Sequence, residues 1–334
     1  MTLKESLLWP LALPYGAAVH LRARAYRTGI LRQRRLDGVV ISVGNLTTGG
    51  TGKTPMVLWI AERLAAEGKS AGILTRGYRG QASAAGSTSD EVRLMQARLG
   101  GRVAFGVGAD RFSRGRELAG RGVKWFVLDD GFQHLQLARD ADIVLIDATN
   151  PFGGGHLLPA GRLREPRSAL ARADLIVITR GDHAPAVEAA IRRDSDAPIF
   201  SARTQLGSIR AWRGEYPGTE DAGARSRKLF AFCGIGNPSA FLADLREWGF
   251  QIAGHALYPD HHRYTRQDIH AIENAAHKAG ASSLICTEKD IFNLSGDRRP
   301  SMDLHYCRIS MRIDREPEFW GAIMKAAQSR GRAE

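Results

Sequence analysis

The chain has 334 residues, of which 43% are hydrophobic and 25% are charged, and its formal net charge at pH 7 is +12. This composition is typical of a soluble globular protein with one large or two smaller domains, and it argues against a disordered chain and against a bundle of membrane spans. The cysteines Cys233, Cys286 and Cys307 are widely spaced with no CxxC pair, so neither a disulfide framework nor a zinc site is expected, and a reducing cytoplasm fits best.

The first 36 residues combine an uncharged segment with a basic one. Residues 6–21, "SLLWPLALPYGAAVHL", are followed by six arginines: Arg22, Arg24, Arg27, Arg32, Arg34 and Arg35. The segment is shorter than the roughly 20 residues that span hydrocarbon, and a signal peptide would carry its positive charge ahead of the apolar part. For residues 1–36 we predict an interfacial, membrane-associating helix region whose arginines bind anionic headgroups. The alternative is a first helix that packs on the domain.

The next segment has the order strand, glycine loop, helix. Residues 39–43, "VVISV", are mostly β-branched and too few for a helix, which indicates a buried strand. From Thr54 onward apolar residues recur with helical spacing, and Gly68 ends the pattern. The "GGTGKT" between them is close to a P-loop, although the glycine expected five residues before Gly52 is Thr47.

A P-loop binds phosphates through its backbone N–H groups and the N-terminus of the helix that follows. Lys53 would reach the β- and γ-phosphates of a nucleotide, and the Thr54 hydroxyl would bind Mg²⁺. The alternative is a structural glycine turn followed by a chance Lys-Thr pair. The predicted nucleotide-binding residues are Thr47, Thr48, Gly49, Gly50, Thr51, Gly52, Lys53 and Thr54.

Apolar strands then alternate with helical segments along most of the chain. Continuous apolar strands separated by helices predict a parallel sheet covered on both faces, which makes the fold class α/β, with a P-loop NTPase-type core and a second, smaller α/β domain. The expected division is a P-loop core over residues 37–213, a linker over 214–227, the smaller domain over 228–310, and a C-terminal helix over 311–334 that packs on the core.

Two adjacent carboxylates end a predicted strand in "KWFVLDDGFQH". A P-loop enzyme needs a carboxylate at the end of a neighbouring strand to hold its metal ion, and Asp129 and Asp130 fit that need better than a packing role. Asp147, at the end of "IVLID", is a rival, but a single aspartate at a strand end is often only a helix cap.

Two further groups are candidates for acid–base chemistry. Asp90 and Glu91 open a predicted helix, where they could be no more than a cap and a first-turn carboxylate. In "YPDHHRYT", Asp260, His261 and His262 suit an imidazole oriented by a carboxylate, whereas two histidines alone do not make a metal site.

Together these motifs resemble one family, the tetraacyldisaccharide 4′-kinases, which are the lipid A 4′-kinases of Gram-negative bacteria. The resemblance rests on motifs that follow the family's order: "SVGNLTTGGTGKTP", "LTRGYRG", "SDEVRLM", "VLDDGFQH", "LLPAGRLREP", "PDHHRYT" and "CTEKD". The family's own loop lacks the leading glycine, which explains Thr47. One departure is Val92, where the family often has proline.

The resemblance implies a reaction and a location. The family transfers the γ-phosphate of ATP to the 4′-hydroxyl of a tetraacylated glucosamine disaccharide 1-phosphate, which gives lipid IVA in lipid A biosynthesis. The implied cofactors are ATP and Mg²⁺, and the implied place is the cytoplasmic face of the inner membrane, as a peripheral protein. Catalysis is expected in a cleft to which the smaller domain contributes.

The resemblance also implies roles for individual residues. Lys53 and Thr54 take the phosphate and magnesium roles, and Asp129 and Asp130 are the metal carboxylates. Asp90 is the base that activates the acceptor hydroxyl, with His261 as its partner from the second domain. Residues at the family's active-site face, expected to bind the lipid substrate, are Arg76, Gly77, Tyr78, Arg164 and Glu165.

Two other function classes remain open on sequence grounds. One is a P-loop ATPase that binds a membrane or nucleic acid and transfers phosphate only to water, but the basic residues are not interleaved with aromatics as in a nucleic-acid module, so no nucleic-acid partner is expected. The other is a kinase for a small soluble acceptor, which would leave the apolar N-terminal segment unexplained.

Overall fold

The computed structural model describes residues 3–77, 89–181, 184–294 and 299–331, without the side chains of residues 3–7, 330 and 331. The chain divides into two compact units. Unit 1 comprises Met1–Gly77, Leu99–Thr204 and Met311–Glu334, and unit 2 comprises Tyr78–Arg98 and Gln205–Ser310. The chain enters unit 2 along strand β7 (Ile199–Trp212) and leaves it along β12 (Leu304–Ile313).

Unit 1 is built on a parallel sheet. Its strand order is β6-β5-β1-β4-β2-β3, and β7 continues the sheet beside β6. The bounds are β1 Val39–Asn45, β2 Ala71–Thr75, β3 Ala104–Val107, β4 Trp125–Asp129, β5 Ala141–Asp147 and β6 Leu175–Thr179. All residues of β2, β5 and β6 are buried, as expected for strands covered on both faces, so the predicted parallel α/β sheet is confirmed.

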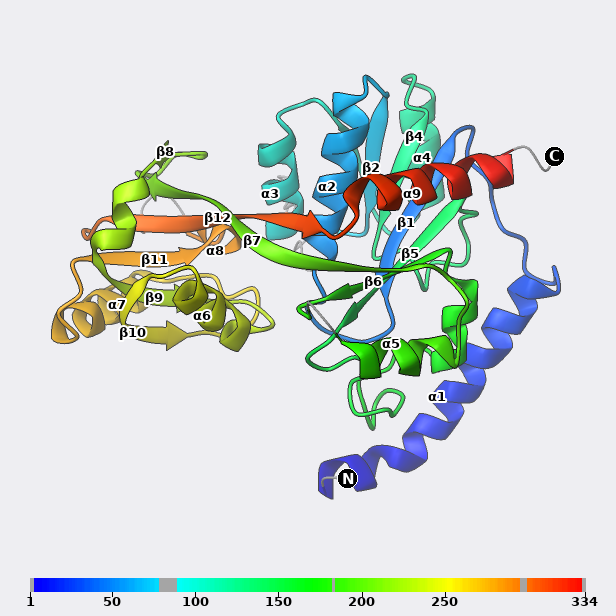
Figure 1. Cartoon of the computed structure of the whole chain (residues 1–334), viewed down its shortest axis with the longest axis horizontal. Coiled ribbons are helices and arrows are strands. Elements are labelled where there is room, and N and C mark those ends of the chain that lie inside the picture. The colour runs from blue at the N-terminus through cyan, green and yellow to red at the C-terminus, as the bar shows by residue number, and fades with distance from the viewer. Residues whose placement is uncertain (1–2, 78–88, 182–183, 295–298, 332–334) are drawn as a thin grey trace. The chain divides into compact units, whose positions relative to one another are not determined.

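The helices of unit 1 follow the alternation that the sequence predicts (Figure 1). They are α2 (Lys53–Ala66), α4 (Arg111–Ala119), α5 (Pro185–Arg192) and the short 3₁₀ helix η1 (Arg167–Arg172). The last helix, α9 (Glu316–Gly331), packs on α2, because Trp59 contacts the Phe319 ring at 5.6 Å between centroids and Trp320 Nε1 donates to Glu67 Oε1 at 2.6 Å. Residues 311–313, expected in this helix, instead end β12.

The first helix, α1 (Leu3–Arg27), is continuous through Pro10 and Pro14. Several of its large apolar side chains are exposed: Trp9, Leu11, Leu13 and Leu21. The helix is also tied to unit 1, because the Tyr15 hydroxyl donates to the Arg164 carbonyl at 2.9 Å. Among the described residues, no helix has the length and apolar content needed to cross a bilayer.

Unit 2 is built on parallel strands in the order β10-β9-β11-β12, as part of the same continuous sheet. Its strands besides β12 are β9 (Lys228–Cys233), β10 (Gln251–Leu257) and β11 (Ser283–Thr287), and the hairpin partner β8 (Thr219–Glu220) pairs with β7. Its helices are α6 (Pro238–Glu247), α7 (Arg266–Lys278), the short α8 (Glu288–Ile291) and the 3₁₀ helix η2 (Ala222–Ser226). Buried aromatic and aliphatic side chains between the sheet and α7, such as Phe232 and Tyr264, form its core.

Helix α3 (Asp90–Leu99) packs with unit 2, although 190 residues separate Arg98 from its partner Glu288. The guanidinium of Arg98 and the carboxylate of Glu288 form a buried ion pair, and the Tyr216 hydroxyl donates to Glu288 at 2.7 Å. This arrangement differs from the expected division, in which residues 37–213 form one domain. The buried Arg98–Glu288 pair ties α3 to unit 2, because a buried charge left without its partner is costly.

Candidate functional site

The phosphate-binding loop of unit 1 lies between β1 and α2, at the carboxyl end of the sheet. Gly49 and Gly52 have φ angles of +126° and +88°, which side-chain-bearing residues rarely adopt. Gly52 directly precedes α2, so the N–H groups of the first helical turn have no partner within the helix. The loop therefore has the backbone shape and the free donors that an anionic phosphate requires.

A second loop braces the phosphate-binding loop. Thr48 N–H donates to the Arg162 carbonyl at 2.8 Å, and Arg162 Nη2 returns a hydrogen bond to the Thr48 carbonyl at 2.7 Å. Arg164 N–H donates to the Leu46 carbonyl at 2.8 Å. A Cβ atom at Gly49 would meet Arg162 Nη2, and the flexible end of that side chain would have to move aside. The "GRLREP" motif thus fixes the shape of the loop.

Lys53 lies among polar groups rather than in solvent. Its Nζ donates to Asn45 Oδ1 at 3.2 Å and forms an ion pair with Asp130 Oδ1 at 3.5 Å. Arg164 Nη1 lies 2.8 Å from each oxygen of the same Asp130 carboxylate. Burial alone would raise the pKa of Asp130, but the charges of Lys53 and Arg164 outweigh it and hold that pKa below its usual value.

The register between β1 and β4 places Asp129 and Asp130 beside the phosphate-binding loop. Asp129 of β4 is paired with Val43 of β1, so both carboxylates lie beside the start of that loop. The Thr75 hydroxyl donates to Asp129 Oδ2 at 2.9 Å, and Asp130 has a φ of +50°, a strained value for a residue with a side chain. The structure therefore brings Lys53, Asp129 and Asp130 together, as the sequence predicts.

The chemistry of these donors suits Mg²⁺. Magnesium is held in proteins by oxygen atoms, commonly by one or two carboxylates together with substrate phosphates. Asp129 and Asp130 supply such carboxylates, and Thr54 contributes a hydroxyl in the first turn of α2. Among the described residues, no group of three or more His, Cys, Asp or Glu side chains forms a metal site by itself.

Asp147, the rival strand-end carboxylate, has a different role. It accepts from the Thr149 backbone N–H at 3.0 Å and from the Thr149 hydroxyl at 2.6 Å, and it pairs with Arg180 at 2.6 Å. These contacts close a turn after β5. In the part of the chain that the structure describes, no helix follows β5 directly, so Asp147 closes a turn instead of capping a helix, the role that the sequence suggested.

The residues expected to bind the lipid substrate have different environments. Arg76 is exposed after β2, and Gly77 has a φ of +69°, while Tyr78 lies outside the described residues. Arg164 is engaged with Asp130, as described above. Glu165 is buried and pairs with Arg172 at 2.9 Å, in the wall of a cavity of about 760 Å³ that α1 also lines.

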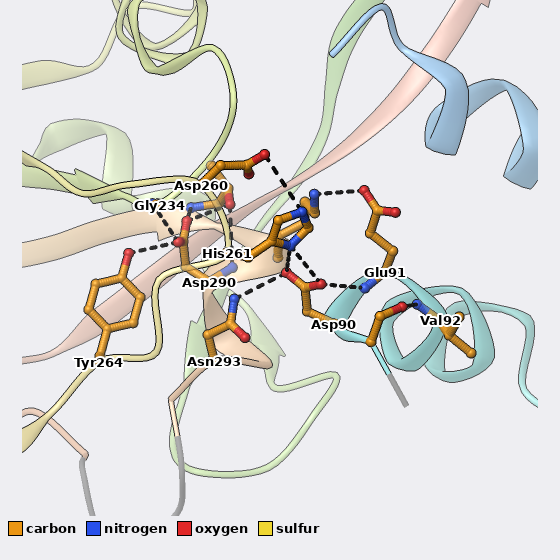
Figure 2. Close-up of polar contacts among 12 residues, drawn as sticks. Asp90, Glu91, Val92, Gly234, Asp260, His261, Tyr264, Asp290 and Asn293 are labelled. Carbon is orange, nitrogen blue, oxygen red and sulfur yellow. Dashed lines mark hydrogen bonds and ion pairs between the residues drawn. The ribbon is translucent and has the colours of Figure 1, made fainter. Parts of the chain in front are cut away.

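Asp90 and His261 form the polar centre of unit 2 (Figure 2). His261 Nδ1 lies 3.0 Å from Oδ1 and 2.9 Å from Oδ2 of the Asp90 carboxylate. Asp90 Oδ1 also accepts from the Glu91 N–H at 3.0 Å, and Asp90 Oδ2 accepts from Asn293 Nδ2 at 3.2 Å. Asp90 begins α3, yet its carboxylate binds an imidazole that lies 171 residues further along the chain. The capping interpretation alone is therefore insufficient.

The electrostatics of this pair favour a charged carboxylate. Burial would raise the pKa of Asp90, but the hydrogen bond from His261, the charge of Lys289 and the hydrogen bond from Asn293 bring it down to about 2. The hydrogen bond to Asp90 raises the pKa of His261, against the effect of burial. His261 also has a φ of +63°, and its N–H donates to the Gly234 carbonyl at 3.0 Å.

Sequence reasoning missed several residues that shape these sites. Asn45 contacts Lys53 through a local hydrogen bond, whereas Arg162 and Asn293 contact predicted residues through long-range ones. The only signal for Arg162 was its place in the "LLPAGRLREP" motif, and Asn293 lies just outside "CTEKD". A polar side chain inside an otherwise apolar run gives no indication of its partner in the fold.

Comparisons with known proteins agree on one family. The model of the family described as LpxK, tetraacyldisaccharide-1-P 4′-kinase, matches residues 4–328. A tetraacyldisaccharide 4′-kinase of Geobacter metallireducens is 42% identical over 309 residues, which cover 86% of this chain and 88% of that protein. A tetraacyldisaccharide 4′-kinase of Anaeromyxobacter sp. is 36% identical over 348 residues, which cover 97% of this chain and 93% of that protein. A crystal structure of LpxK from Aquifex aeolicus in complex with ATP matches with a TM-score of 0.76 and 27% sequence identity. The match covers 97% of this chain and 99% of the Aquifex aeolicus chain.

Proposed function

The chain belongs to the tetraacyldisaccharide-1-phosphate 4′-kinase family, and we propose that it transfers the γ-phosphate of ATP to the 4′-hydroxyl of a tetraacylated glucosamine disaccharide 1-phosphate. The product is the lipid A precursor lipid IVA. The observation that carries the kinase chemistry is the Asp90–His261 hydrogen bond, because a kinase has to position and deprotonate an acceptor hydroxyl, whereas an ATPase acts on water.

The residues of unit 1 would bind the nucleotide. The loop from Thr47 to Thr54 would bind the phosphates through its N–H groups, and Lys53 would leave its contacts with Asn45 and Asp130 for the β- and γ-phosphate oxygens. An ammonium group already held at this edge of the sheet has only a short distance to move. The ATP complex of the Aquifex aeolicus relative supports ATP as the donor.

Mg²⁺ would be held by Thr54, Asp129 and Asp130, and when bound it would neutralise charge on the transferred phosphoryl group. The Thr75 hydroxyl orients the Asp129 carboxylate for this role, and the cations Lys53 and Arg164 keep Asp130 ionised. Asp130 would thus exchange part of its contact with Arg164 for the metal ion.

The residues of unit 2 would act on the acceptor. The 4′-hydroxyl oxygen forms a bond to the γ-phosphorus, the bond from that phosphorus to the β–γ bridging oxygen breaks, ADP leaves, and the hydroxyl proton passes to Asp90. A carboxylate with a pKa of about 2 is a weak base. That is sufficient in a loose phosphoryl-transfer transition state, in which positioning and charge neutralisation supply most of the catalysis.

His261 would hold Asp90 in place. Its Nδ1 bridges the two carboxylate oxygens, so the carboxylate cannot rotate without losing this bond. The backbone of His261 has a strained φ of +63° and is anchored on the Gly234 carbonyl, which supports a fixed place for the residue. Arg76, Gly77, Arg164 and Glu165, together with Tyr78 outside the described residues, remain the proposed contacts for the lipid acceptor.

The N-terminal helix would bring the enzyme to its substrate. We place the protein peripherally on the cytoplasmic face of the inner membrane, with Trp9, Leu11 and Leu13 of α1 in the bilayer surface and the following arginines on anionic headgroups. Sedimentation with anionic vesicles tests this: we expect detergent to release the protein better than salt. Complete release by salt alone would contradict insertion of the apolar side chains.

The test of the proposed function is a transfer assay with γ-labelled ATP. Wild type should move the label to a tetraacyldisaccharide 1-phosphate in detergent micelles, and Lys53→Ala should not. A matched control is Lys278→Ala, at the end of α7 in unit 2, which should keep wild-type transfer. Label released only as inorganic phosphate would identify a P-loop ATPase and would overturn the proposal.

A further inference from the structure

A short segment after β11 contacts Asp90, other residues of α3 and the backbone of Gly234. Thr287 ends β11 and caps α8. Figure 2 shows Asp290 of this segment beside Gly234, and Asn293 beside Asp90. The contacts made by this segment are Glu288 with Arg98, Lys289 with Glu91 at 2.8 Å, Asp290 with the Gly234 N–H at 2.8 Å, and Asn293 with Asp90 at 3.2 Å.

Asp290 ties this segment to the loop that carries His261. Its buried carboxylate accepts from the Gly234 N–H and, at 2.7 Å, from the Tyr264 hydroxyl. The Gly234 carbonyl in turn accepts from the His261 N–H at 3.0 Å. The segment that holds the imidazole loop is therefore the same one that presents Asn293 to the carboxylate.

The hydrogen bonds to Asp90 leave little freedom to its carboxylate. Its two oxygens offer about four acceptor positions. Glu91 N–H occupies one on Oδ1, Asn293 Nδ2 occupies one on Oδ2, and His261 Nδ1 lies between the two oxygens. Asp90 and Asn293 are only 7% and 8% exposed, so water competes poorly for these positions. The arrangement leaves about one acceptor position for an incoming hydroxyl.

We propose that Asn293 is a positioning residue for phosphoryl transfer, because its amide fixes the Asp90 carboxylate with one acceptor position open to the acceptor hydroxyl. This inference rests on the proposed function, in which Asp90 accepts the proton of that hydroxyl. Asn293 is suited to the task because it is a neutral donor, so it orients the carboxylate without adding a further charge to its surroundings.

Charged groups surround Asp90 from three elements of unit 2. Helix α3 contributes Glu91 and Arg93, the loop before α7 contributes Asp260, His261 and Arg263, and α8 contributes Lys289. The titration of the Asp90–His261 pair therefore responds to any new charge at position 293. A negative charge should move it to higher pH and a positive charge to lower pH.

The test compares Asn293→Asp and Asn293→Lys in the full-length enzyme. We expect Asn293→Asp, which replaces the donor by an acceptor of the same shape, to lower kcat about 10- to 100-fold with KM for ATP nearly unchanged, because a small misplacement of a reacting group can cost about 10²-fold. The apparent pKa of the Asp90–His261 pair, read from the pH dependence of the transfer rate, should rise by about 1 unit in Asn293→Asp and fall in Asn293→Lys.

Two controls make the outcomes distinct. Asn274→Asp makes the same substitution on the exposed face of α7, and it should keep the wild-type rate and pH profile. Asp90→Ala is the reference for the proposed function: wild-type transfer by this variant would remove Asp90 from the mechanism. An inactive Asp90→Ala beside unshifted profiles in both Asn293 variants would overturn only the positioning role.

Thermal unfolding separates positioning from folding. Shifts of this apparent pKa in opposite directions at position 293 support the proposal, because loss of structure would not depend on the sign of the charge. A lowered unfolding temperature with an unshifted apparent pKa in both variants would mean that Asn293 is merely structural, which contradicts it. If Asn293→Asp does not fold, the direction of the shift in Asn293→Lys decides the question alone.

Discussion

Lys53 of the phosphate-binding loop and Asp130 at the end of β4 form an ion pair of 3.5 Å, and Arg164 binds the same carboxylate at 2.8 Å. The two cations keep the Asp130 carboxylate ionised. The carboxylate in turn holds Lys53 at the edge of the sheet where a nucleotide would bind. This arrangement belongs to unit 1 alone, and it gives Asp130 a role that Asp147, at the end of β5 on the other side of β1, does not share.

Replacement of Asp130 by asparagine tests this role. Asp130→Asn keeps the shape but removes the charge, and we expect kcat to fall about 10²- to 10³-fold, as when one preorganised electrostatic group is removed from an active site. Asp147→Asn is the matched control and should stay within about threefold of wild type. Equal losses in the two variants, or a fully active Asp130→Asn, would contradict the assignment.

Gly49 and Gly50 differ in how much room they have. Gly49→Ala would force a residue with a side chain to a φ of +126° and against Arg162, which costs about 1–3 kcal/mol of backbone strain. A Cβ at Gly50 meets nothing within 4 Å. We therefore expect Gly49→Ala to weaken ATP binding much more than Gly50→Ala, measured by calorimetric titration. Similar affinities of the two variants would show that the loop changes shape when nucleotide binds.

The ion pair between Arg98 and Glu288 should hold α3 in unit 2. Arg98→Met leaves the Glu288 carboxylate buried without its charged partner, so we expect a loss of about 3–5 kcal/mol in the free energy of unfolding, and Glu288→Gln added to it should recover part of that loss. Urea unfolding measures the free energy of unfolding of Arg98→Met and of the double variant with Glu288→Gln. The exposed pair Arg114–Glu117 is the control, and its loss should cost less than about 1 kcal/mol. A small effect of Arg98→Met would mean that the other contacts of α3, such as Glu91 with Lys289, are enough to hold it in unit 2.

The Asp90–His261 pair should make stability depend on pH. Because the folded pKa of His261 is raised above its unfolded value of 6.5, its contribution is fully present below pH 6.5 and is lost as the pH rises through the folded pKa. The folded pKa of Asp90 is about 2, so its contribution is lost only as the pH falls from about 4 through that value.

Urea unfolding of wild type and His261→Gln tests this sign. We expect the difference in unfolding free energy to be larger at pH 5.5 than at pH 9. His277→Gln, which changes an exposed imidazole of α7, is the control. A difference that grows toward pH 9 would contradict the hydrogen bond from His261 to the Asp90 carboxylate.

Local patterns predicted most of the core but not how its pieces join. The run "VVISV", the glycine loop and the apolar spacing after Thr54 predicted β1, the phosphate-binding loop and α2, because each pattern reflects burial within one element. Asp129 and Asp130 were predicted from their place at a strand end, and the β1–β4 register brings them to the phosphate-binding loop.

Long-range contacts could not be predicted in this way. Nothing near Asp90 in the sequence indicates that α3 packs with residues 205–310, because that placement depends on Arg98, Glu91 and Asp90 meeting partners about 170 to 200 residues away. Asn293 was missed for the same reason, since a single asparagine in "IFNL" has no periodic signature. The resemblance to a family supplied the pairing of Asp90 with His261, which the residues alone left open.

The most direct test of the account is a double-mutant cycle on Asp90 and His261, measured as transfer of labelled phosphate to the lipid acceptor. If the two residues act as one base, Asp90→Ala, His261→Ala and the double variant should lose similar activity, within the roughly 10²- to 10⁴-fold that general base catalysis contributes. If the two single losses multiply in the double variant, the residues act independently, and the hydrogen bond between them is not the basis of catalysis.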